Sequence, residues 1–118
     1  MEPMSQSESQ PVLLLVRDLM FSSKITATAR SESILVKIVR DAAKLTEEGG
    51  NRLIVDLNQD GAIPAAAQWK ARTGGTVVGF VSHVDTSTIA EAREAGLDQV
   101  LARSRFVETL ADVLKAKG

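Results

Sequence analysis

Acidic, hydroxyl and basic side chains follow four of the short apolar runs in this sequence, at the places where strands of a sheet would end. They are Asp18, Asp56, Ser82 and Arg103. Two carboxylates a few ångströms apart repel each other, and a divalent cation that prefers oxygen ligands, such as Mg²⁺, relieves that repulsion. A hydroxyl group and a fixed cation on the far side could then hold phosphoryl oxygens. These residue types favour the phosphorylation of a carboxylate.

The elements that must position these side chains alternate along the chain from Pro11 onward. Short runs rich in β-branched residues, apolar on both faces, are typical of strands buried in a parallel sheet. They predict strands at Val12–Val16, Ile34–Val39, Leu53–Val55, Val77–Val81 and Gln99–Ala102. Segments with helical spacing follow them, at Phe21–Ala29, Arg40–Glu48, the segment after Pro64, Thr86–Gly96 and Phe106–Leu114. The alternation predicts an α/β fold, a three-layer, doubly wound, five-stranded parallel sheet of order 2-1-3-4-5, flavodoxin-like in type.

The predicted strand order decides which of these side chains meet. In open α/β sheets, ligands bind beyond the carboxyl ends of the strands, beside the point where the strand order reverses. With the order 2-1-3-4-5, the first and third strands are neighbours. We therefore expect Asp18 and Asp56 to share one crevice.

Composition narrows the class of protein. The 118 residues, 44% apolar and 25% charged, predict a single domain over residues 11–118 after a disordered lead-in over residues 1–10. The absence of cysteine excludes disulfide scaffolds and cysteine-ligated metals, and a single histidine, His83, excludes a site with two imidazoles. A net charge of −1 without a basic stripe argues against nucleic acid. No run is long enough to cross a membrane and no signal peptide precedes the domain, so we expect a cytoplasmic protein.

Four stretches of the chain, in this order and spacing, resemble the receiver domains of bacterial two-component response regulators. LVRDLMFSSKI resembles the first strand and its acidic loop, and LIVDLNQDG resembles the strand that carries the phosphoacceptor. VVGFVSHVDTSTIAEAREAGLD resembles the fourth strand and helix, and VLARSRFVETL the last strand and helix. The resemblance implies a phosphorelay signalling module rather than a conventional enzyme, with no activity beyond its own phosphorylation and dephosphorylation.

The resemblance also implies a role for each site residue. Asp56 would accept a phosphoryl group from a histidine kinase or a small phosphodonor. Asp18, Asp56 and the backbone carbonyl of Asn58 would hold Mg²⁺. Ser82 would bind the phosphoryl group, and Arg103 stands where the family has a lysine. Partners would be signalling proteins, and a homodimer through the last helix is possible for this family.

Several positions depart from the family's pattern. Arg17 replaces the first acid of the expected pair, Arg103-Ser104 replaces Lys-Pro, and His83 replaces a small residue. Guanidinium and ammonium differ in length and shape, so the change to arginine alters the site. These departures leave an alternative open, a phosphorylation-independent pseudo-receiver that acts as a protein-interaction scaffold.

Two further interpretations concern the same segments. Residues 56–63 reproduce the first positions of an EF-hand calcium loop, but Ala67 stands where its bidentate carboxylate belongs and a strand precedes it. A flavodoxin-like domain that binds a small ligand is the other, although the loop after the first strand has no glycine to cradle a phosphate.

Overall fold

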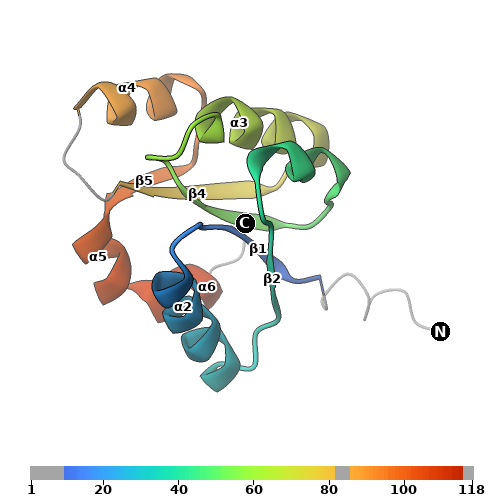
Figure 1. The fold of residues 1–118 in the computed structure, drawn as a ribbon, viewed down its shortest axis with the longest axis vertical. Helices are drawn as coiled ribbons and strands as arrows, with labels where there is room; N and C mark the ends of the chain where they lie inside the picture. Colours follow the sequence, from blue (N-terminus) through green and yellow to red (C-terminus); the bar gives the residue numbers. More distant parts are fainter. Residues whose placement is uncertain (1–9, 82–85, 116–118) are drawn as a thin grey trace.

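Five parallel strands form one sheet at the centre of the fold (Figure 1). The computed structural model describes residues 10–81 and 86–115. The strands are β1 (Val12–Leu15), β2 (Val36–Ile38), β3 (Arg52–Asp56), β4 (Thr76–Val81) and β5 (Gln99–Ala102). Their order in the sheet is β2-β1-β3-β4-β5, and every neighbouring pair is parallel. The predicted fold class and strand order are confirmed.

Helices cover both faces of this sheet and make the fold three-layered. They are α2 (Leu19–Ser31), the 3₁₀ helix η1 (Ala42–Glu47), α3 (Ala62–Thr73), α4 (Thr86–Glu94), α5 (Arg103–Glu108) and α6 (Leu110–Lys115). Figure 1 shows α2, α5 and α6 on one side of the sheet and η1, α3 and α4 on the other. Each crossover returns the chain to the same edge, so the carboxyl ends of all five strands meet there.

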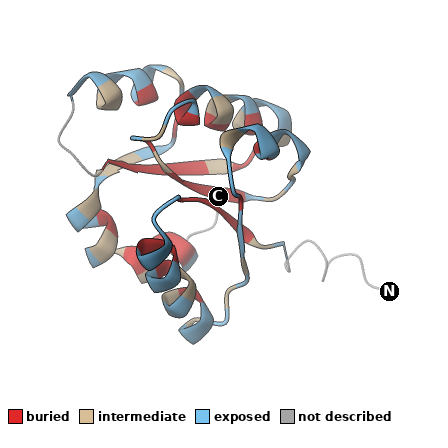
Figure 2. Ribbon diagram, viewed as in Figure 1, coloured by how far each residue is buried: buried red, intermediate tan, exposed pale blue. Residues whose placement is uncertain are grey.

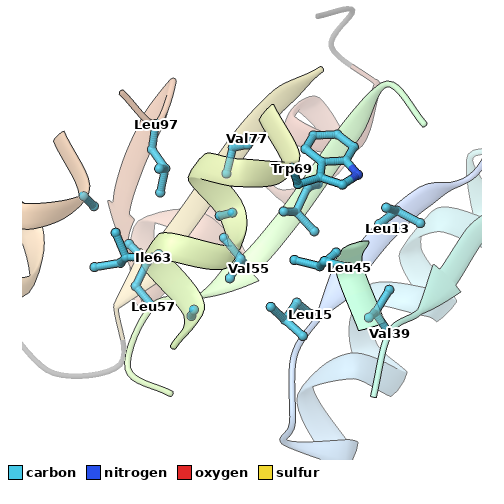
Figure 3. Close-up of a cluster of buried hydrophobic side chains, with 14 of the residues drawn as sticks. Leu13, Leu15, Val39, Leu45, Val55, Leu57, Ile63, Trp69, Val77 and Leu97 are labelled. Atoms are coloured by element: carbon cyan, nitrogen blue, oxygen red, sulfur yellow. The ribbon is translucent and has the colours of Figure 1, made fainter. Parts of the chain in front are cut away.

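The strands divide their side chains between two cores because successive residues point to opposite faces. In β1, Leu13 and Leu15 pack in the core under η1, α3 and α4, which Figure 3 shows in close-up. Leu14 packs with the helices of the other face. Figure 2 shows the central strands β1, β3 and β4 buried, whereas the edge strands β2 and β5 and the outer helix faces are largely exposed or half-buried. Burial on both faces explains the continuous apolar runs in the sequence.

Two helical segments differ from the sequence expectation. The segment predicted as a helix at residues 40–48 is the short η1, in which the carbonyl of Leu45 accepts hydrogen bonds from the Glu48 N–H and from Arg72 Nη2, at 3.1 and 2.7 Å. The last predicted helix is interrupted at Thr109, whose hydroxyl binds the Arg105 carbonyl. A side-chain hydroxyl that bonds to the preceding turn competes with regular helix geometry. The apolar stripe predicted across the interruption is nevertheless buried, as expected.

Two further expectations concern the bounds of the domain and the absence of a membrane-spanning segment. The lead-in predicted as disordered, residues 1–10, lies outside the described residues apart from Gln10, and the extent of the domain, residues 11–118, stays a prediction. Among residues 10–81 and 86–115, none of the helices has both the length and the apolar character needed to cross a bilayer.

Candidate functional site

The first acid of the predicted pair, Asp18, begins helix α2. It lies beyond the end of β1 in extended conformation, and its Oδ1 accepts hydrogen bonds from the N–H groups of Met20 and Phe21 at 3.0 and 3.1 Å. These bonds satisfy two of the backbone donors that a helix start leaves without partners. The other oxygen, Oδ2, accepts from Arg103 Nη2 at 3.4 Å. Asp18 is therefore both the N-cap of α2 and one half of an ion pair.

The ionisation of Asp18 follows from these contacts. The N–H of Phe21 lowers the pKa of the carboxyl group most, and partial removal from water acts in the opposite direction. The hydrogen bond and charge of Arg103, together with the N–H of Met20, lower the pKa further, so it lies below its ordinary value. Asp18 is thus a carboxylate at neutral pH, and its charge is partly neutralised within the protein.

The second acid, Asp56, is the last residue of β3 and is half-buried. Its Oδ1 accepts a hydrogen bond from the N–H of Asn58 at 3.0 Å. In the described part of the chain, no other hydrogen bond or ion pair engages this carboxylate. Leu15 of β1 is in register with Val55, so Asp56 ends β3 at the same edge of the sheet at which Asp18 follows β1. The topology places both acids at the carboxyl edge of neighbouring strands, and their sharing of one crevice stays a prediction.

A side chain that the sequence analysis did not single out, Gln59, ties this edge together. Its Nε2 donates to the carbonyl of Leu15 at 2.7 Å and to the carbonyl of Asp56 at 3.1 Å. The ends of β1 and β3 are thereby held by one amide group. The signal in the sequence was a long polar side chain in the turn after the third strand, but the partner in β1 is remote in sequence and only the fold supplies it.

The cation of the site, Arg103, is the first residue of α5, directly after β5. In addition to its contact with Asp18, its Cζ lies 4.0 Å from the centre of the Phe21 ring, a cation–π geometry. Phe21 in turn contacts Phe80 and Phe106, with ring centres 5.0 and 5.8 Å away. These are the three phenylalanines of the sequence, and they form an aromatic cluster of which Phe21 contacts the guanidinium. The sequence analysis did not connect them, because they come from three different segments.

The other residues singled out from the sequence either make no hydrogen bond or ion pair with the Asp18–Arg103 pair in the described residues or lie outside those residues. Ser82 and His83 lie outside the described residues. Arg17 is exposed, and the ion pair that the structure gives Asp18 is with Arg103. Ser104 lies in the first turn of α5. The EF-hand interpretation does not fit, because β3 precedes the loop and α3 begins at Ala62, within the stretch that a calcium loop would need.

The residues of this edge fit a divalent cation poorly. Such ions take several carboxylate and carbonyl oxygens. Within the described ranges, no group of three or more histidine, aspartate or glutamate residues could hold a metal ion. Of the two carboxylates present, Asp18 already accepts from two N–H groups and a guanidinium. The magnesium site of Asp18, Asp56 and Asn58 stays a prediction, and the geometry of Asp18 argues against it.

Comparisons with solved structures identify the fold. A CheY-like response regulator receiver domain protein from Methanospirillum hungatei JF-1 has a TM-score of 0.70 at 14% identity, over 88% of this chain and 95% of that one. A Burkholderia pseudomallei response regulator, solved with a phosphorylated aspartic acid, a calcium ion and citrate, has a TM-score of 0.74 at 15% identity, over 91% and 67%. The BeF₃-activated DrrB receiver domain has a TM-score of 0.76 at 15% identity, over 90% and 94%.

These similarities define the class of the fold. The chain has the flavodoxin-like fold of CheY-like receiver domains, as the resemblance in the sequence implied. The sequence matches no protein-family model and none of the curated proteins compared with it. At identities of 14 and 15%, these similarities concern the fold.

Proposed function

We propose that this chain is a signal-transduction receiver module whose Asp56 carboxylate accepts a phosphoryl group. The observation that carries the proposal is the position of Asp56, which ends the central strand β3 at the carboxyl edge of an open α/β sheet, where such folds bind ligands. The fold that the chain shares with receiver domains supports it. The alternative expected from the sequence, a phosphorylation-independent scaffold, is the outcome left if Asp56 accepts no phosphoryl group.

For the transfer of a phosphoryl group to Asp56, the protein has to supply mainly the position of the reacting atoms and the charges around them. A carboxylate oxygen of Asp56 attacks the phosphorus of the donor in line with the leaving group. A new P–O bond forms, and the bond from phosphorus to the donor breaks, with the electron pair leaving on the imidazole nitrogen of a phosphohistidine or the acyl oxygen of a small phosphodonor. The N–H of Asn58 holds Oδ1 at 3.0 Å and fixes the orientation of the carboxylate. Water later hydrolyses the acyl phosphate and restores Asp56.

The other expectations from the sequence belong to this proposal. A histidine kinase or another signalling protein is the proposed partner, and the cytoplasm is the proposed location. Ser82 is the proposed hydrogen-bond donor to the phosphoryl group, with Arg103 as the cation of the site. A homodimer through the last helical face is a further expectation of the receiver interpretation. The Mg²⁺ expected from the sequence finds few suitable ligands here, and no step above depends on it.

Intact mass spectrometry after incubation with acetyl phosphate tests the proposal. We expect a gain of one phosphoryl group, lost in Asp56→Asn. Asp60→Asn is the matched control, because Asp60 is an exposed acid in the same turn and its removal should leave the adduct unchanged. No adduct in the wild-type chain under any condition, or an adduct that survives Asp56→Asn, would overturn the assignment of Asp56 as the acceptor.

A further inference from the structure

The ion pair between Arg103 and Asp18 joins two elements from distant parts of the chain. Asp18 follows β1, and Arg103 follows β5 at the far edge of the sheet. The guanidinium reaches the carboxylate because α2 and α5 lie on the same face of the sheet, as Figure 1 shows. Nη2 lies 3.4 Å from Oδ2, and both side chains are partly exposed, at 38% and 47%. An exposed ion pair alone is weak, so its persistence depends on what else holds the arginine.

The ring of Phe21, which belongs to the aromatic cluster, also holds the Arg103 side chain. The Arg103 Cζ lies 4.0 Å from the Phe21 ring centre. Phe21 is 5% exposed, and its ring cannot move away because Phe80 and Phe106, stacked on each other at 4.9 Å, pack beside it. Phe21 also donates its own N–H to Asp18. Phe21 therefore contacts both members of the ion pair, through its N–H and through its ring. These contacts hold the guanidinium beside the carboxylate.

The charged side chains at the carboxyl edge of the sheet give a divalent cation little to bind. Arg17 and Arg103 each carry one positive charge, and Asp18 and Asp56 each carry one negative charge, so the four side chains sum to zero. A guanidinium has five N–H donors in a planar fork that suits oxyanions. Only Nη2 of Arg103 is engaged with Asp18. Within residues 10–81 and 86–115, no other hydrogen bond engages the remaining donors, which suits them to an anion at the carboxyl edge of the sheet.

We propose that the Arg103 guanidinium takes the place of a divalent cation beside Asp18, so that this site works without Mg²⁺. In this arrangement the guanidinium partly offsets the negative charge of Asp18, which a bound metal would otherwise do. The part of the proposal that concerns transfer to Asp56 rests on the proposed function. The part that concerns competition between arginine and metal for Asp18 does not.

Direct measurement of Mn²⁺ binding, by the electron paramagnetic resonance signal of the free ion, tests the competition. We expect Arg103→Gln to bind Mn²⁺ about tenfold more tightly than the wild type, the effect in water of removing one positive charge about 6 Å from a divalent ion. Adding Asp18→Asn should remove the gain. The matched control is Arg105→Gln, an exposed arginine of the same helix that pairs with Glu108, which should leave binding unchanged.

A second arm measures phosphorylation by acetyl phosphate in excess EDTA and in excess Mg²⁺. We expect equal rates for the wild type and a rate that depends on Mg²⁺ for Arg103→Gln. Wild-type binding of Mn²⁺ as tight as that of Arg103→Gln, a gain that survives Asp18→Asn, or wild-type phosphorylation abolished by EDTA would each overturn the proposal. If no condition yields an adduct, the proposed function fails, and the Mn²⁺ arm alone decides the role of Arg103.

Discussion

Gly79 is the position where one added methyl group should disturb both the core and the acceptor loop. It lies inside β4, opposite Val55 of β3. A Cβ at this position would lie 2.6, 2.8 and 2.9 Å from Cδ1, Cγ and Cδ2 of Leu57. Real Cβ atoms do not approach carbon so closely, so Leu57 must move. Leu57 is 3% exposed and directly follows Asp56, which leaves it no route into solvent and couples its movement to the acceptor.

The size of the effect follows from two opposing contributions. Forcing an extra methyl group into a packed core costs about 1–3 kcal/mol. The backbone of Gly79 is not in the left-handed region, so alanine adds no strain there, and its lower entropy in the unfolded chain returns about 0.5–1 kcal/mol. We expect Gly79→Ala to lower the free energy of unfolding by about 1–2 kcal/mol. Phosphorylation of Asp56, where it occurs, should slow in parallel.

Urea unfolding measures this change, with the single tryptophan as the probe. Trp69 is 1% exposed, so its fluorescence should shift to the red when the chain unfolds. Gly49→Ala is the matched control, because a Cβ there meets nothing within 4 Å and φ is not positive. In a Leu57→Ala background the cost of Gly79→Ala should disappear, a coupling of about 1 kcal/mol or more. Equal stability of Gly79→Ala and wild type, or strictly additive effects, would refute the steric argument.

Two further perturbations test other parts of the fold. A Cβ on Gly75 would lie 2.4 and 2.8 Å from Cη2 and Cζ3 of the buried Trp69 and 3.0 Å from the carbonyl oxygen of Asn51, so Gly75→Ala should lower the free energy of unfolding by about 3 kcal/mol. Trp69→Phe should relieve the contacts with the indole ring, and because it removes the fluorescent probe, urea unfolding of these variants is followed by circular dichroism. Burial raises the pKa of Asp98, but the N–H of Val77 and the ammonium of Lys70 outweigh it and hold the pKa below its ordinary value. The contribution of Asp98 to stability is therefore complete above about pH 4 and is lost as the pH falls towards the lower folded-state pKa. Acid unfolding followed by circular dichroism should show this loss, and Lys70→Met should reduce it; an unchanged acid limb in Lys70→Met would contradict the assignment.

The sheet could be predicted because its signal is local. The central strands β1, β3 and β4 are short, mostly apolar runs because both of their faces are buried, whereas the edge strands β2 and β5 are partly exposed and give a weaker signal. The alternation of strands with helices then restricts the topology to a few right-handed arrangements. Asp56 could be placed at the carboxyl edge for the same reason, since the end of an apolar run marks the end of a strand.

The short η1 could not be predicted in the same way. The local sequence from Arg40 to Glu48 has helix-forming residues and a glycine stop, and local signals decided the expectation. In the structure, Arg72 of α3 donates to the carbonyls of Leu45 and Glu48 at 2.7 and 2.8 Å. These bonds come from a helix more than twenty residues later, and tertiary contacts of this kind override local propensity.

The contacts of Asp18 and Arg103 could not be predicted from the sequence, because they join residues that are distant along the chain and close only in the fold. Asp18 was expected to face a metal ion, and its other roles follow from neighbours that one sequence does not place: the backbone of the helix it caps and an arginine eighty-five positions away. Sequence patterns assign a residue type to an edge of a sheet, but the partner of each charge depends on side-chain length and on which helices share a face. For Asp18, that partner is a long guanidinium that also packs against the Phe21 ring, and neither contact can be read from the spacing of the residues in the sequence.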